Sequence, residues 1–119
     1  MALNNLRVVA CRETTQDPAG EVHTAWVAQV LEHEVACQAP SLHELLLRLE
    51  LSVKANDRLL DSRGRGLERL PPAPRYVHEV FEAAKVRVTF NSLDGRSFEI
   101  ALPGENVLLE AGMKARRGS

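Results

Sequence analysis

The first forty residues alternate between segments that favour strands and short polar turns. Residues 6–12 are rich in β-branched side chains, and residues 22–31 carry apolar side chains in both alternating registers. A strand that is apolar on both faces is normally covered on both. Residues 17–20 (DPAG) suit a tight turn, because proline fixes φ and glycine tolerates positive φ. Residues 35–38 predict a third strand.

Residues 41–56 predict a helix that opens with a capping box formed by Ser41 and Glu44. In this motif the serine hydroxyl accepts the glutamate amide, and the glutamate carboxylate accepts the serine amide. Apolar side chains follow at helical spacing and predict a stripe that packs on the sheet. They are Leu42, Leu45, Leu46, Leu49 and Val53. Leu47 and Leu51 lie on a different face, where the later loop partly covers them or they form an interface.

The second half of the chain predicts a loop, a short helix and a strand pair. Residues 60–74 are interrupted by prolines and glycines and show no periodicity. Residues 75–85 predict a helix, and residues 86–90 and 98–102 alternate as half-buried strands joined by a glycine turn. Residues 107–113 are apolar but fit either a helix or a strand. The side chains expected to face inward from the short helix are Val77, Val80, Phe81 and Ala84.

These elements predict an α+β fold with an antiparallel sheet, one main helix packed on a face (a β-β-β-α core), then a short helix and a β-hairpin. A chain of 119 residues has room for a single domain, residues 1–119. Its expected parts are the core (6–56), the loop (57–74), the C-terminal unit (75–113) and a basic tail (114–119). Two helices cannot cover both faces of five strands, so we expect a homodimer or tetramer.

The charge balance argues against a dedicated nucleic-acid binder. The net charge is −1, whereas phosphate binding normally requires a basic excess. The arginines around the loop remain candidates for an anionic partner, either RNA or an acidic protein surface: Arg63, Arg65, Arg69 and Arg75. The alternative is a solvated loop neutralised by Asp57, Asp61 and Glu68. The chain shows no secretion signal and no apolar run long enough for a membrane span, so we expect a cytoplasmic protein.

Candidate chemistry is sparse along the chain, and we expect no catalytic residue, metal or cofactor. A zinc site would have to combine Cys11, His23, His33 and Cys37, of which only the last two have ligand-like spacing. The two cysteines are expected to be small buried thiols. The acidic residues do not form the convergent pattern of a two-metal nuclease. They are Glu13, Glu32, Glu34 and Glu44.

The segment AWVAQVLEHEVACQAPSLHELLLRLE resembles the HicB-like antitoxin family. The match rests on the aromatic strand (residues 26–28), on Leu31 before the turn, and on Ser41 and Glu44 at the helix start. It covers about residues 6–54, and the later segment LPPAPRYVHEVFEAA is similar to a stretch that follows this domain in some solitary members. Glutamate and histidine replace the usual Gly-Cys after the second strand, Ala-Pro replaces the glycine before the cap, and the C-terminal DNA-binding segment is lacking.

The resemblance implies a partial RNase H-like fold and a non-catalytic role in which the protein binds and neutralises a small toxin-like protein. It also implies frequent self-assembly. Trp26 is then a candidate anchor for the partner, because aromatic side chains contribute strongly to interfaces. The alternative for Trp26 is simple core packing. A second function class, an RNA-binding accessory domain, would use the arginine-rich loop.

Overall fold

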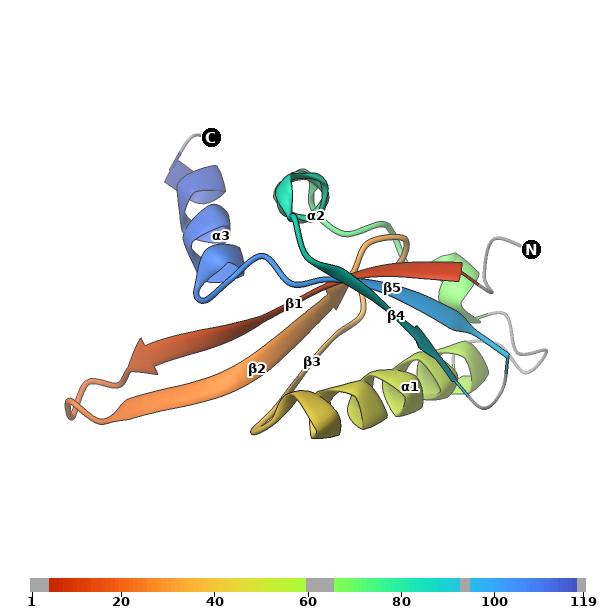
Figure 1. Ribbon diagram of the computed structural model, residues 1–119, viewed down its shortest axis with the longest axis horizontal. Helices are drawn as coiled ribbons and strands as arrows, with labels where there is room; N and C mark the ends of the chain where they lie inside the picture. Colours follow the sequence, from red (N-terminus) through yellow and green to blue (C-terminus); the bar gives the residue numbers. More distant parts are fainter. Residues whose placement is uncertain (1–4, 60–65, 93–94, 118–119) are drawn as a thin grey trace.

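The computed structural model describes residues 5–59, 66–92 and 95–117 and shows one five-stranded sheet with helices on both faces (Figure 1). The predicted α+β class, with one main helix packed on the sheet, is confirmed. The strand order is β3-β2-β1-β5-β4. In chain order the elements are β1 (Asn5–Gln16), β2 (Val22–Val30), β3 (Ala36–Ala39), α1 (Leu42–Leu59), the 3-10 helix η2 (Gly66–Arg69), α2 (Arg75–Ala83), β4 (Arg87–Asn91), β5 (Ser97–Ala101) and α3 (Val107–Arg117).

The β1–β2 hairpin is the longest unit of the sheet. Its two strands pair antiparallel from Val8 opposite Val30 to Gln16 opposite Val22. The turn has the predicted chemistry, since Gly20 adopts a φ of 89° and its amide donates to the Asp17 carbonyl at 2.9 Å. The strands are longer than the first predicted strand, because pairing continues through polar residues that the β-branched pattern did not reach.

The sheet is mixed and not wholly antiparallel, because β5 pairs parallel to β1. The β4–β5 hairpin adds to the sheet with β5 on the inside and β4 at the edge. This places β1 in the centre, where both faces are covered over its first half. The apolar side chains Val8 and Val9, which point to opposite faces, are both fully buried.

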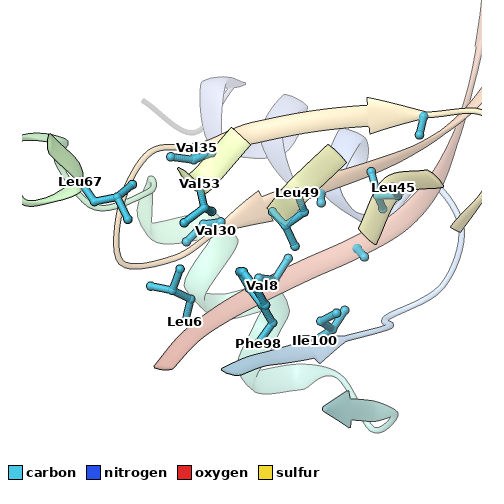
Figure 2. Close-up of a cluster of buried hydrophobic side chains, with 13 residues drawn as sticks. Leu6, Val8, Val30, Val35, Leu45, Leu49, Val53, Leu67, Phe98 and Ile100 are labelled. Carbon is cyan, nitrogen blue, oxygen red and sulfur yellow. The ribbon is translucent and has the colours of Figure 1, made fainter. Parts of the chain in front are cut away.

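Helix α1 covers one face, and Figure 2 shows Leu45, Leu49 and Val53 of the predicted stripe within the core, whereas Leu42 and Leu46 are half-buried. Leu45, Leu49 and Val53 are fully buried against β1, β2 and β5. The helix begins as predicted, with the Ser41 hydroxyl accepting the Glu44 amide at 3.2 Å. The second half of the capping box is not seen among the described contacts, where the Glu44 carboxylate lies 3.7 Å from Arg48. One more helical turn than predicted extends α1 to residue 59.

Helices α2 and α3 lie on the opposite face of the sheet (Figure 1). Val77, Val80 and Phe81 of α2 are buried, as predicted. The apolar segment 107–113, which fits either a helix or a strand, is the start of α3, and the helix continues through the expected basic tail to residue 117. The homodimer was predicted because this face lacked a cover. Since α3 covers part of it, that reason no longer applies, and the oligomeric state stays a prediction.

The described part of the chain contains no helix that is both long and apolar enough to cross a lipid bilayer. Residues 57–74, predicted to be a loop, include the last turn of α1 and the short helix η2. Arg63 and Arg65, together with two residues of the predicted β4–β5 turn, lie outside the described residues.

Candidate functional site

A groove, here called the sheet groove, lies on the face that carries α2 and α3. Its floor is formed by side chains of β1, β2 and β3, and its wall by α3 and by Tyr76 of α2. Its volume is about 460 Å³. The lining residues are Glu13, Thr15, His23, Ala25, Val27, Gln29, Gln38, Tyr76, Leu108 and Leu109.

The groove exists because the β1–β2 hairpin is longer than the helices that cover it. In Figure 1 the two strands continue past α3 towards their turn. Side chains alternate along a strand, so the odd-numbered residues of both strands share this face. Near the centre they are buried under α2 and α3, whereas Ala25 and Val27 are only half-buried and His23 is exposed. The floor therefore changes from apolar to polar along its length.

Asn106 attaches the start of α3 to the edge of β1. The Asn106 amide donates to the Arg12 carbonyl at 2.7 Å, and its side-chain oxygen accepts the Thr14 amide at 2.7 Å. These two bonds continue the pairing of β1 beyond the end of β5. Asn106 adopts a φ of 57°, a left-handed conformation that asparagine tolerates better than most residues. The turn thereby directs α3 across the sheet.

The Glu13 side chain, on β1, forms a hydrogen bond with the first turn of α3. Its Oε1 accepts the Leu109 amide at 3.0 Å, which satisfies a helix N-terminal donor that has no partner within the helix. The same oxygen accepts the Cys11 thiol at 2.9 Å. Burial raises the pKa of the Cys11 thiol to about 12, and the hydrogen bond to Glu13 adds to the shift. Cys11 is therefore a protonated donor at neutral pH and not a nucleophile.

The second carboxylate oxygen of Glu13 is in a different situation. Oε2 is buried and accepts no hydrogen bond from the described residues. Only 9% of Glu13 is exposed, yet the residue lines the groove. A buried acceptor without a partner is costly and uncommon in folded proteins. Glu13 thus combines a structural role at one oxygen with an unused acceptor at the other.

The residues predicted to bind a partner do not gather in one place. Trp26 points to the α1 face, where it is half-buried and packs beside the core, in line with the packing alternative. Leu47 and Leu51 are exposed on the outer side of α1. Neither leucine lines the sheet groove. Residues 60–65 of the loop that was a candidate to cover them lie outside the described residues, so both alternatives, cover by the loop and an interface, stay predictions.

The arginines predicted to contact an anionic partner are only partly described. Arg69 ends η2, and Arg75 begins α2, where it pairs with Glu79 at 3.4 Å. Since Arg63 and Arg65 lie outside the described residues, the structure does not show an arginine cluster. The RNA-binding alternative stays a prediction, and no specific observation favours it.

The imagined zinc ligands are not brought together in the part of the chain that the structure describes. There, the one group of potential ligands is Asp17, Glu21 and His23 at the β1–β2 turn. Its contacts are those of a stable turn, because the Asp17 carboxylate accepts the Glu21 amide and bonds with His23, both at 2.9 Å. The hydrogen bond to His23 holds the pKa of Asp17 below its usual value. Both cysteines are free thiols.

The acidic residues considered as nuclease ligands also have structural partners. Glu32 pairs with Arg7 at 2.6 Å and also accepts the Arg7 amide. The Glu44 amide donates to the Ser41 hydroxyl that caps α1, and the Glu44 carboxylate lies 3.7 Å from Arg48. Glu13 was considered only as a nuclease ligand, although one signal pointed to another role. It shares its register in β1 with the apolar residues Val9 and Cys11, and this register could have indicated a buried acid.

Comparison with protein-family models, with curated proteins and with solved structures finds no match to this chain. The resemblance to HicB-like antitoxins stays a prediction from the sequence. The function is therefore inferred from the geometry and chemistry of the sheet groove.

Proposed function

We propose that this chain is a non-catalytic protein-binding module of the HicB-like type, and that the sheet groove holds a segment of its partner. The observation that carries the proposal is the groove itself, in which an apolar floor and wall meet polar side chains. Val27 and Leu108 offer apolar contacts, while Thr15 and Gln38 lie where they can bond to a backbone. Binding sites commonly combine a mainly apolar lining with a few polar groups that fix orientation.

The shape of the groove favours a polypeptide segment over a small molecule. Alternate residues of β2 from His23 to Gln29 line the groove beside α3, so a partner's side chains can enter it along this length of the strand. A partner segment would bury the half-exposed floor residues Ala25 and Val27. Burial of apolar area contributes roughly 25 cal/mol per Å², which makes this floor the main source of affinity.

The chemistry of the lining favours a partner with basic residues. Glu13 brings a carboxylate to the groove, and no lysine or arginine lines it in the described part of the chain. This agrees with the partner that the family resemblance implies, a small toxin-like protein, if that protein is basic. The thiol of Cys11, protonated and bonded to Glu13, supports a structural role and not a catalytic one.

The test compares two variants of one strand. Ala25→Phe places a ring on the floor of the groove, and Thr24→Phe places the same ring on the opposite, exposed face of β2. Peptides are first selected against the unmodified chain from a random library displayed on phage, and their affinities are then measured by titration calorimetry. We expect the affinity to fall at least about tenfold for Ala25→Phe, because several contacts are blocked, and to stay unchanged for Thr24→Phe.

Selected peptides that bind Ala25→Phe as well as the unmodified chain would locate their site elsewhere and contradict the proposal. Circular dichroism of both variants checks that the fold is retained. Aromatic residues suit strands, so neither substitution should disturb β2 itself.

We also propose that a second copy of the chain pairs with the edge strand β4. Among the described strands none pairs with the outer side of β4, and Val86 and Val88 are exposed at 55% and 45%. Such edges tend to pair with another strand unless they are protected. Light scattering should give a mass near twice 13.2 kDa, and Val88→Lys should reduce it, with Leu51→Lys on α1 as the control. A single-chain mass at tens of micromolar would contradict this proposal.

A further inference from the structure

Resting on the proposed function, we propose that the sheet groove selects a primary ammonium group, such as the end of a lysine side chain, through Glu13 Oε2. The carboxylate is almost completely buried, and one of its two oxygens has no donor among the described residues. A buried carboxylate is stabilised when charged donors reach it. A ligand ammonium supplies such a donor at the point where the chain does not.

The neighbours of Glu13 explain why its second oxygen finds no hydrogen-bond donor in the described part of the chain. Ala25 lies directly opposite in the β1–β2 pairing and has no polar side chain. His23, the next residue of β2 on this face, is bonded to Asp17. Arg12 points to the other face and pairs with Glu105 at 2.9 Å. Among the described residues, these two neighbouring polar side chains, His23 and Arg12, are therefore bonded elsewhere.

The geometry favours an ammonium over a guanidinium. Arginine typically binds a carboxylate with two parallel hydrogen bonds, one to each oxygen. Glu13 Oε1 already accepts the Leu109 amide and the Cys11 thiol, so a single oxygen remains. A lysine ammonium is a compact point charge that needs only one acceptor from the protein.

The groove also suits the aliphatic stem that precedes such an ammonium. Val27, Tyr76 and Leu108 provide an apolar surface beside Glu13, and lysine methylene groups pack well on surfaces of this kind. Because Oε2 is buried, entry of an ammonium requires the side chains of the wall to move. The backbone amides of Leu108 and Leu109 should therefore respond to binding.

The experiment uses small probes that separate charge from apolar contact. Hexylammonium chloride and hexan-1-ol are each titrated into the nitrogen-15-labelled chain, and amide shifts are followed by NMR. We expect hexylammonium to shift the amides of Ala25, Val27 and Leu109 and to bind at least about tenfold more tightly than hexanol, as a charged hydrogen bond implies. Hexylguanidinium should bind more weakly than hexylammonium.

The matched variant is Glu13→Gln, which keeps an oxygen for the Leu109 amide but removes the charge. Hexylammonium affinity should fall to that of hexanol in this variant. If Glu13→Gln does not fold, Ala25→Phe provides the test, since it keeps Glu13 and fills the floor; hexylammonium binding should then be lost. Undiminished hexylammonium affinity in folded Glu13→Gln, hexylammonium binding by folded Ala25→Phe, or equal binding of the charged and neutral probes to the unmodified chain would overturn the inference.

These outcomes are separable from a failure of the proposed function. Peptides that bind the unmodified chain and Glu13→Gln equally, but not Ala25→Phe, would keep the groove as a protein-binding site and remove its preference for an ammonium.

Discussion

The two faces of the sheet are covered in different ways. On one face, a single helix of 18 residues packs a regular apolar stripe into a continuous core. On the other face, two shorter helices from the C-terminal part of the chain share the cover, and polar contacts from Glu13 and Asn106 attach one of them. On the first face, the packed side chains of α1 fill the space above the sheet. On the second face, the sheet groove remains beside the hydrogen bonds that attach α3.

This difference separates stability from recognition within one small domain. The α1 face buries Leu45, Leu49 and Val53 completely and therefore has little reason to change on binding. The opposite face leaves apolar floor residues half-exposed, and one oxygen of Glu13 has no hydrogen-bond donor among the described residues. Binding sites often retain such locally unfavourable features, which a ligand then relieves. Four predictions test whether the two faces differ in this way.

The largest effect is expected from the centre of the α1 face. Leu49→Ala should lower the free energy of unfolding by about 2–5 kcal/mol, because a fully buried leucine leaves a cavity when truncated. Leu51→Ala, two residues further and 66% exposed, is the control and should change it by less than about 0.5 kcal/mol. Urea denaturation measures both. Similar costs for the two variants would mean that the helix packs through another side.

A smaller effect is expected where α3 is attached. Asn106→Ala should cost about 1–3 kcal/mol, because it removes the acceptor of the Thr14 amide and places alanine at positive φ. Asn106→Gly loses only the hydrogen bond and should cost about 0.5–1.5 kcal/mol. Thermal or urea unfolding measures the difference. If the glycine variant were the less stable one, the backbone conformation would not be what makes Asn106 suitable.

The Ser41 cap at the start of α1 should contribute less to the free energy of unfolding than the attachment of α3. Ser41→Ala should cost about 1 kcal/mol, because the Glu44 amide loses its side-chain acceptor. Glu44→Ala is the matched variant, and it should cost less than about 0.5 kcal/mol, since its carboxylate makes only a surface contact with Arg48. Equal losses in urea denaturation would restore the full capping box that the sequence predicted.

The last prediction concerns the chemical reactivity of the two cysteines and involves no change in stability. Cys11, buried beneath α3 with its pKa raised to about 12, should resist alkylation by iodoacetamide at neutral pH. Cys37 is only half-buried and should react first, although burial also raises its pKa. Mass spectrometry of the folded and the denatured chain measures the order. Rapid modification of Cys11 in the folded chain would show that α3 opens frequently.

Local patterns predicted the parts of the fold that depend on neighbours in the sequence. Ser41 and the leucines that follow determine where α1 begins and which side it buries, and Gly20 suits the turn between the first two strands. The parallel pairing of β1 with β5 depends on how distant hairpins meet, which no local pattern encodes. The structure of residues 107–113 also stayed open, because Gly112 weakens the helical signal. In the structure, α3 approaches Tyr76 closely at Gly112, where a Cβ added to the glycine would lie 3.3 Å from the tyrosine ring.

The candidate site was less predictable than the fold. Trp26, Leu47 and Leu51 were chosen for their type and apparent exposure, but the groove is built on the other face of β2 from Trp26. The contacts that attach α3 beside the groove join residues far apart in the sequence. Thr14 and Asn106 are separated by 92 positions, and Glu13 and Leu109 by 96. A single sequence gives no information on such pairs. Only the acid in an apolar register of β1 could have indicated Glu13.

The parallel pairing of β1 with β5 has a consequence for how the protein is made. During translation, β1 emerges first but remains an unpaired edge on one side until residues 97–101 leave the ribosome. Domains usually acquire long-range pairings late, because the intervening chain must first be closed into a loop. The wall of the groove, α3, is synthesised later still. A nascent chain therefore cannot offer the complete groove, and capture of a partner must follow synthesis of the C-terminal helix.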